Sequence, residues 1–205
     1  MQSVELTYPF RGRWLVQNSP ADRIPSHGSR LYGTTYAIDF VRVDSRRRSL
    51  PFTLASLVRP EPPERFIGFG QPILAPTSGV VVAVHEGEPD HDSFRGLPSI
   101  GYALTQRRRV ARGWSGLAGN YVVIEVACGR AVVALCHLRQ GSILVQPGQP
   151  LAAGTPVGQC GNSGNSTEPH VHVQAMDTLD ANSAIGVPLS FPGGLPRNGD
   201  IVDAP

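Results

Sequence analysis

The stretch GNSGNSTEPHVHV, residues 161–173, joins a run of small turn-forming residues to two histidines separated by one residue. Side chains on a strand alternate between its faces, so His170 and His172 are expected to project into one site while Val171 faces the packed side. A helix would place the two imidazoles about 200° apart, and Pro169 argues against a helix interior. Two imidazoles on one face can hold a metal ion with one ring and handle a proton or an oxyanion with the other.

Length and composition predict a single domain over residues 1–205, large enough to bury a core. Glycine and proline are frequent and aromatic residues are few, which favours many short strands joined by tight turns. The net charge of +2 gives only a weak footprint for nucleic acid, so no nucleic-acid partner is expected. All eighteen basic residues are arginine, which excludes a lipoyl-lysine, a biotinyl-lysine or a Schiff base.

The ends of the chain and its cysteines say little about location. No segment approaches the roughly 18 apolar residues that span a bilayer, and residues 1–6 lack the basic and apolar regions of a signal peptide. Either the protein stays inside the cell, or the sequence begins after a removed leader. The cysteines 128, 136 and 160 match no common zinc framework. We expect them to be reduced and buried, with a Cys136–Cys160 disulfide as the alternative that geometry would decide.

Short apolar runs predict the strands, and polar runs predict the loops between them. Residues 42–70 are expected to form loops or a short covering helix, and residues 86–118 a long polar loop insertion. The arginine clusters at 46–48 and 107–109 are expected to be solvated loop charge, with contact to an anionic polymer as the lesser alternative. Strands are expected at residues 13–16, 36–41, 80–85, 121–127 and 131–138. The last two should form a hairpin around 128–130. Tight turns over 145–158 and a Gly/Pro-rich segment after 182 at the edge of the domain should follow.

Several polar residues in this pattern are candidates for chemistry. Asp39 lies in an apolar strand, where a carboxylate needs a partner or a metal ion, although a pairing with an arginine is the structural alternative. His27, Asp39 and His172, with His137 and His170 beside them, offer two nitrogens, one oxygen and an open fourth position. That is the arrangement of a catalytic zinc site. The chain has no His-Glu-x-x-His helix, which excludes a thermolysin-type site.

The order of these residues resembles the lysostaphin-type zinc metallopeptidases, the LytM-like peptidoglycan endopeptidases. The resemblance is carried by Asp39 with an upstream His27, His137-Leu138, residues 141–148, residues 158–167 and His170-Val171-His172. It is dense over 71–175, thinner over 18–41, and has no match in 86–118.

The resemblance implies one Zn²⁺ per chain, held by His27, Asp39 and His172, with His137 and His170 as catalytic histidines that do not bind the metal. The family usually places only a few residues between its first histidine and its aspartate, whereas eleven separate His27 from Asp39 here. The intervening segment must therefore loop out and return, and His85 and His91 are the alternative ligands if it does not.

Two further departures from the family pattern lie beside the His-x-His motif. Glu168 stands where the family commonly has glycine, and Gln174 where it often has glutamate. Gln174 is nevertheless expected to orient an imidazole by accepting a hydrogen bond.

The implied fold is mainly β, an antiparallel β-sheet groove or sandwich of the duplicated hybrid type with long loops as walls. The implied reaction is hydrolysis of peptide bonds in the stem or cross-bridge peptides of peptidoglycan. One of His137 and His170 would take the proton of the attacking water and the other would stabilise the oxyanion. The family also implies a location outside the cell or in its envelope.

Two other classes of function compete with the peptidase. A degenerate family member would keep the fold and act as a cell-wall binding or activator module. A histidine phosphocarrier would also use two close histidines, but would not need Asp39 in a buried strand. The least informative alternative, a His-x-His that merely decorates a strand, does not explain the ordered set of residues.

Overall fold

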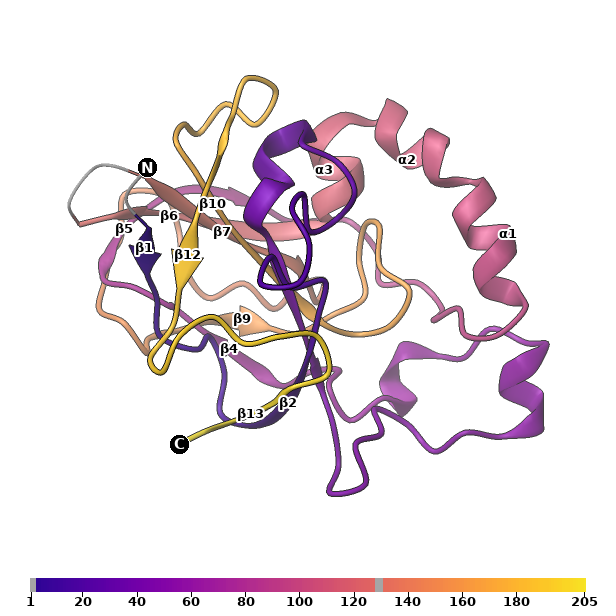
Figure 1. Cartoon of the computed structure of the whole chain (residues 1–205). Helices are drawn as coiled ribbons and strands as arrows, with labels where there is room; N and C mark the ends of the chain where they lie inside the picture. Colours follow the sequence, from indigo (N-terminus) through magenta and orange to yellow (C-terminus); the bar gives the residue numbers. More distant parts are fainter. Residues whose placement is uncertain (1–2, 128–130) are drawn as a thin grey trace.

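The described part of the chain is built around one large antiparallel sheet. The computed structural model describes residues 3–127 and 131–205, and within them nine strands share this sheet. Figure 1 shows it as a twisted layer with the helices along one edge. In spatial order its strands are β13 (Ile201–Ala204), β2 (Gly12–Gln17), β3 (Ile38–Arg42), β10 (Val171–Met176), β7 (Val132–Leu138), β6 (Asn120–Val126), β5 (Gly79–His85) and β8 (Pro150–Leu151), with β11 (Gly186–Val187) also paired to β10. The mainly β, antiparallel fold that the sequence predicted is confirmed.

The strands divide their side chains between a packed face and a functional face. On β10, Val171 and Val173 join the main apolar core, and on β3 so does Phe40. The residues between them on the strands, His172 and Asp39, lie on the opposite face, as period-two alternation requires. The packed face is rich in aromatic rings that contact one another, namely Tyr8, Phe10, Trp14, Phe40 and Phe191.

Two smaller pairs of strands flank the main sheet. β1 (Val4–Glu5) runs parallel to β12 (Leu189–Ser190), and β4 (Pro72–Leu74) pairs with β9 (Pro156–Gln159). The predicted strands all form, with bounds shifted by a few residues. The expected hairpin joins β6 to β7, but its turn at 128–130 lies outside the described residues. The segment after residue 182 contributes the edge strand β13, as expected.

Helices occupy the segment predicted as a polar loop, and short helices lie in the segment where loops or a short covering helix were expected. The expectation of a structureless loop over 86–118 is wrong, because this segment holds α1 (Pro98–Leu104), α2 (Gln106–Ala111) and α3 (Gly113–Ala118). The 42–70 segment holds the short 3-10 helices η2 (Leu54–Leu57) and η3 (Pro63–Arg65), while η1 (Leu31–Tyr36) precedes β3. Of the helices in the described ranges, none has the length and apolar character to cross a membrane.

The two cysteines that the structure describes are buried and unbridged. Cys136 and Cys160 are both free thiols, so the alternative disulfide does not form. Burial raises the pKa of both thiols. Cys128 lies outside the described residues.

Candidate metal centre and cavity

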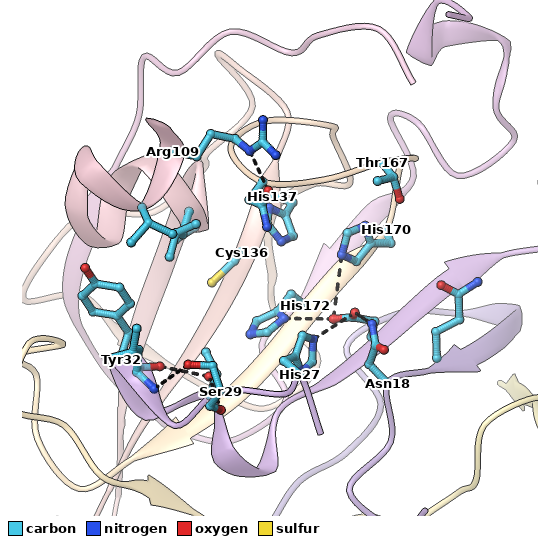
Figure 2. Close-up of a pocket in the computed structure, with 18 of the residues that line it drawn as sticks. Asn18, His27, Ser29, Tyr32, Arg109, Cys136, His137, Thr167, His170 and His172 are labelled. Carbon is cyan, nitrogen blue, oxygen red and sulfur yellow. Dashed lines mark hydrogen bonds and ion pairs between the residues drawn. The ribbon is translucent and has the colours of Figure 1, made fainter. Parts of the chain in front are cut away.

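Three predicted ligands converge on the functional face of the sheet. His172 on β10 pairs in register with Asp39 on β3, which places their side chains next to each other. His172 Nδ1 lies 2.9 Å from Asp39 Oδ1, and His27 Nε2 lies 3.0 Å from Asp39 Oδ2. One donor atom from each residue falls within 4.8 Å of the others. Figure 2 shows the imidazoles of His27 and His172 close together, with Asn18 beside them.

The long segment between His27 and Asp39 folds back on itself. Ser26 N donates a hydrogen bond to Thr35 O at 3.1 Å, which closes the loop at its base. Gly33 turns the chain with a left-handed φ of 74°, and a Cβ there would come within 2.7 Å of the Met176 side chain. The structure therefore brings His27 to Asp39 by looping out and returning. His85 and His91, the alternative ligands, do not line the site.

Hydrogen bonds fix which nitrogen of His172 carries the proton. The Gln174 amide donates from Nε2 to Tyr32 O at 2.8 Å, and a carbonyl oxygen only accepts, so the amide orientation is determined. Its Oε1 atom then accepts from His172 Nε2 at 2.9 Å. In the neutral ring, His172 Nδ1 is then unprotonated, and its lone pair faces Asp39. This is the orienting contact that the sequence predicted for Gln174.

His27 can take the matching tautomer. Ser26 Oγ lies 3.3 Å from Thr34 O and 3.0 Å from His27 Nδ1, so when its hydroxyl donates to the carbonyl it accepts from that nitrogen. His27 Nε2 is then also a lone pair that faces Asp39. With these tautomers, two imidazole lone pairs and a carboxylate gather within 4.8 Å of one another, an arrangement that repels in neutral rings and that a cation between them would satisfy. The donor set of two nitrogens and one oxygen fits Zn²⁺.

Asp39 is held in its charged form. Burial alone would raise the pKa of its carboxyl, but the imidazoles of His27, His170 and His172 beside it outweigh burial and keep this pKa well below its ordinary value. Asn18 adds a hydrogen bond from Nδ2 to Asp39 Oδ2 at 2.7 Å. An ionised carboxylate is the form that binds a metal ion.

The two remaining histidines stand beside this set with matched tautomers. His137 Nδ1 lies 2.9 Å from Ser163 O, and His170 Nδ1 lies 2.8 Å from Glu168 O. Carbonyl oxygens only accept, so both rings carry a proton on Nδ1, and in the neutral form of each ring Nε2 is the unprotonated nitrogen. The ring centroids are 4.6 Å apart, and His170 Nε2 lies 3.8 Å from Asp39 Oδ1.

His137 reaches this face through a bulge in β7. Leu135 and Leu138 both belong to the packed face, so an unbroken strand would direct His137 there as well. Instead, Asn120 pairs with Leu138 while Val122 pairs with Leu135, so β7 carries one extra residue. The left-handed φ of 62° at His137 marks this bulge. Burial, together with His170 and His172 nearby, lowers the pKa of His137 well below its ordinary value, so the ring is neutral.

A cavity of about 390 Å³ opens above these residues. One wall comes from residues 27–34 and the other from α1–α3, including Tyr102, Arg109 and Trp114. The expectation that 86–118 forms a wall holds, but residues 42–70 do not line the cavity. That segment instead packs behind the wall, where Glu61 pairs with Arg95 at 2.7 Å.

Some residues at the site had no signal in the sequence. Asn18 reaches Asp39 from the end of β2, and Ser166 Oγ lies 3.0 Å from His170 Nδ1. Ser166 belongs to the Gly-rich stretch that the sequence singled out, whereas Asn18 lies outside every motif. Arg109 is held by side-chain and backbone contacts at the cavity, so solvated loop charge is the wrong description for it.

Comparison with known families supports this reading. The model of peptidase family M23 matches residues 102–184, a segment that contains His137, His170 and His172. The resemblance noted in the sequence is confirmed, although the match also covers residues 102–118, where none was expected. The match supports a peptidase, which is a hydrolase.

Solved structures of peptidases align with this chain at low identity and low TM-scores. The catalytic domain of lysostaphin from Staphylococcus simulans aligns at 16% identity over 88% of this chain and 86% of that chain, with a TM-score of 0.43. A mutant catalytic domain of the prophage-encoded M23 protein EnpA from Enterococcus faecalis aligns at 20% identity over 74% of this chain and 73% of that chain, with a TM-score of 0.43. A zinc-containing peptidase from Vibrio cholerae aligns at 19% identity over 73% of this chain and 48% of that chain, with a TM-score of 0.37. These likenesses are partial.

Proposed function

We propose that this protein is a zinc-dependent endopeptidase of the M23 type that hydrolyses peptide bonds in peptidoglycan. The observation that carries the proposal is the cluster of His27, Asp39 and His172, in which one imidazole nitrogen of each histidine faces an oxygen of the ionised Asp39. The M23 match over His137, His170 and His172 supports the same class of reaction.

When bound, Zn²⁺ would polarise a carbonyl group and lower the pKa of a bound water to about 7. The chain itself supplies two histidines that line the cavity, His137 and His170, each with a proton on Nδ1 and with Nε2 left for the reaction. One can accept a proton at Nε2 as general base, and its protonated form, or the other ring once protonated, can donate a hydrogen bond to an oxyanion. Both rings share the same tautomer, so either one fits either role.

The proposed substrate is a stem or cross-bridge peptide of a bacterial cell wall, and the proposed place of action is the cell envelope or the space outside it. A cavity lined on two sides suits a slim chain better than a folded protein. A degenerate binding module is the weaker reading, because such a module has no need of five correctly oriented site residues.

The direct test uses purified cell-wall sacculi. The zinc-loaded protein should release new amino termini from them, and His172→Ala should release fewer than about one hundredth as many, because the loss of a ligand removes the metal. His85→Ala is the matched control, since His85 lies outside the cavity. Metal content is measured on all three proteins. A zinc-loaded wild type that releases nothing from sacculi of several compositions would contradict the proposal.

A further inference from the structure

Arg109 is the one arginine among the described residues that line the cavity. It lies on α2, in the wall opposite residues 27–34, and Figure 2 shows it on the helical side of the site. Its side chain is partly buried. The proposed hydrolysis uses the histidines and Asp39 and gives Arg109 no part, so its position requires another explanation.

The guanidinium group is fixed in one orientation. Nε donates to Asn165 Oδ1 at 2.6 Å, Nη1 to Thr105 Oγ1 at 2.8 Å and Nη2 to Tyr102 O at 2.7 Å. Its Cζ atom lies 3.7 Å from the centroid of the Tyr102 ring, so the planar group stacks on an aromatic face. Most of the rotamer freedom of this long side chain is lost in the folded protein, so a ligand would not have to restrict it again.

These contacts leave donors unused. A guanidinium has five N–H groups, and the three hydrogen bonds leave one N–H on each terminal nitrogen. All three acceptors are neutral oxygens. Within residues 3–127 and 131–205, no carboxylate lies within ion-pair distance of Arg109. Its positive charge is therefore unmatched inside the protein.

The carboxylates that share the cavity are already engaged elsewhere. Asp39 is surrounded by histidines and Asn18, and Glu168 accepts a hydrogen bond from Ser49 Oγ at 2.6 Å. Asn165 links the arginine to the loop that carries His170, five residues further along the chain. An anion on Arg109 would thus occupy the same cavity as the proposed catalytic histidines.

We propose that Arg109 determines specificity by binding a carboxylate of the substrate peptide, which makes the preferred substrate an anionic peptide and not a neutral one. The inference rests on the proposed peptidase function. The carboxylate can belong to a side chain or to the C-terminus, since a planar fork with two free N–H groups recognises either.

The test compares matched muropeptides on the zinc-loaded protein. Four forms of one cross-linked muropeptide are used: all carboxylates free, the side-chain carboxylates amidated, the C-terminal carboxylate amidated, and both amidated. The wild type should cleave the free form with a kcat/KM roughly 10- to 150-fold above that of the doubly amidated form, the range expected for a hydrogen bond to a charged group. The two singly amidated forms identify which carboxylate is bound.

Two variants attribute this preference to Arg109. Arg109→Gln should abolish the preference, so that the ratio of kcat/KM between the free and the doubly amidated form falls to about one. Asn165→Asp, nearly isosteric, should also reduce the preference, because it places an internal carboxylate on the same guanidinium. Arg112→Gln is the control, since Arg112 is exposed, pairs with Glu88 and does not line the cavity.

The outcomes separate this inference from the proposed function. Equal cleavage of all four forms by the wild type, or an equal loss on all four forms in Arg109→Gln, would overturn the role of Arg109 while the peptidase stands. If nothing is cleaved, the peptidase proposal fails, and binding of the free and doubly amidated forms by calorimetry decides the question for Arg109. Tighter binding of the free form that disappears in Arg109→Gln supports the role, and equal binding overturns it.

Discussion

At the scale of single residues, Gln174 connects two parts of the site that are far apart in sequence. Its oxygen accepts from His172, and its nitrogen donates to the carbonyl of Tyr32, a non-glycine residue with a left-handed φ of 56°. The amide thus fixes the tautomer of a proposed ligand and also anchors the segment that returns from His27 to Asp39.

We expect Gln174→Met to weaken zinc binding by about 10- to 100-fold, because His172 loses the acceptor that fixes its ring. Gln174→Glu should lose less zinc affinity, since a carboxylate still accepts from His172 Nε2, although it can no longer donate to Tyr32 O. Zinc dissociation constants measured by competition with a chelator check both changes. A Gln174→Met protein that binds zinc like the wild type would show that the contact is incidental.

Some of these residues could be predicted from the sequence, and others could not. The i and i+2 spacing places His170 and His172 on one face, and an aspartate in an apolar strand marks Asp39. Asn18 and Arg109 carry no such pattern, because their roles depend on which segments meet in three dimensions. His137 joined the candidate set as a histidine at the end of an apolar run, and its catalytic role was predicted only from the family resemblance. Strand alternation alone would have placed it on the packed face, and the bulge that redirects it has no signature in the sequence.

At the scale of elements, the Gly-rich loop before β10 is pressed against the end of α3. A Cβ on Gly164 would lie 2.4 Å from Gly119 N and 2.6 Å from Leu117 O, so only glycine fits there. The neighbours of Gly164 in sequence serve the site directly: Ser163 O accepts from His137, and Asn165 accepts from Arg109. The close approach therefore sets the positions of both contacts.

Gly164→Ala should destabilise the protein by several kcal/mol, the sum of left-handed strain, roughly 1–2 kcal/mol, and overpacking against backbone, roughly 1–3 kcal/mol. Gly141→Ala is the matched control. Gly141 has a similar φ of 71°, but nothing lies within 4 Å of its added Cβ, so it should show the strain alone. Urea unfolding midpoints measure both. Equal losses in the two variants would mean that the loop shifts to admit the methyl group.

The strands were easier to predict than the helices for a physical reason. A strand needs only a short alternating or apolar run, and β6 and β7 are valine-rich. The helices in 98–118 are six or seven residues long and bury little, so no apolar stripe at helical spacing develops along them. Leu97, Ile100 and Leu104 in this region are all exposed.

At the scale of the whole molecule, the sheet separates stability from chemistry. One face packs the aromatic cluster, and the other holds polar residues that would prefer water or a metal ion. The functional face should make the free energy of unfolding depend on pH, because His137 on that face is buried and its pKa is lowered.

The metal-free protein should lose stability as the pH falls below about 6.5, the ordinary pKa of histidine. The unfolded chain binds a proton there, while folded His137 stays neutral until its own lower pKa is reached. Its contribution is thus complete above the unfolded pKa and is lost as the pH falls. The slope contributed by this group approaches about 1.4 kcal/mol per pH unit. Urea unfolding in chelator between pH 8 and 5 measures it.

His137→Asn is the appropriate comparison for that measurement. Asparagine tolerates a left-handed φ and can donate to Ser163 O, but it does not titrate in this range. The variant should show a shallower dependence on pH than the wild type. An unchanged slope would assign the effect to other groups.

The floor and the helical wall of the cavity differ in how firmly neighbouring elements hold them. The floor belongs to β3, β7 and β10, strands fixed by their neighbours on both sides, whereas α1 and α2 form a single layer with no buried residue among those whose burial is described. A change in the floor disturbs strands that pair on both sides, while a change in the wall disturbs only the contacts of the wall. Substitutions in the wall can therefore accumulate during evolution and change which substrates bind, while the residues of the floor are inherited unchanged.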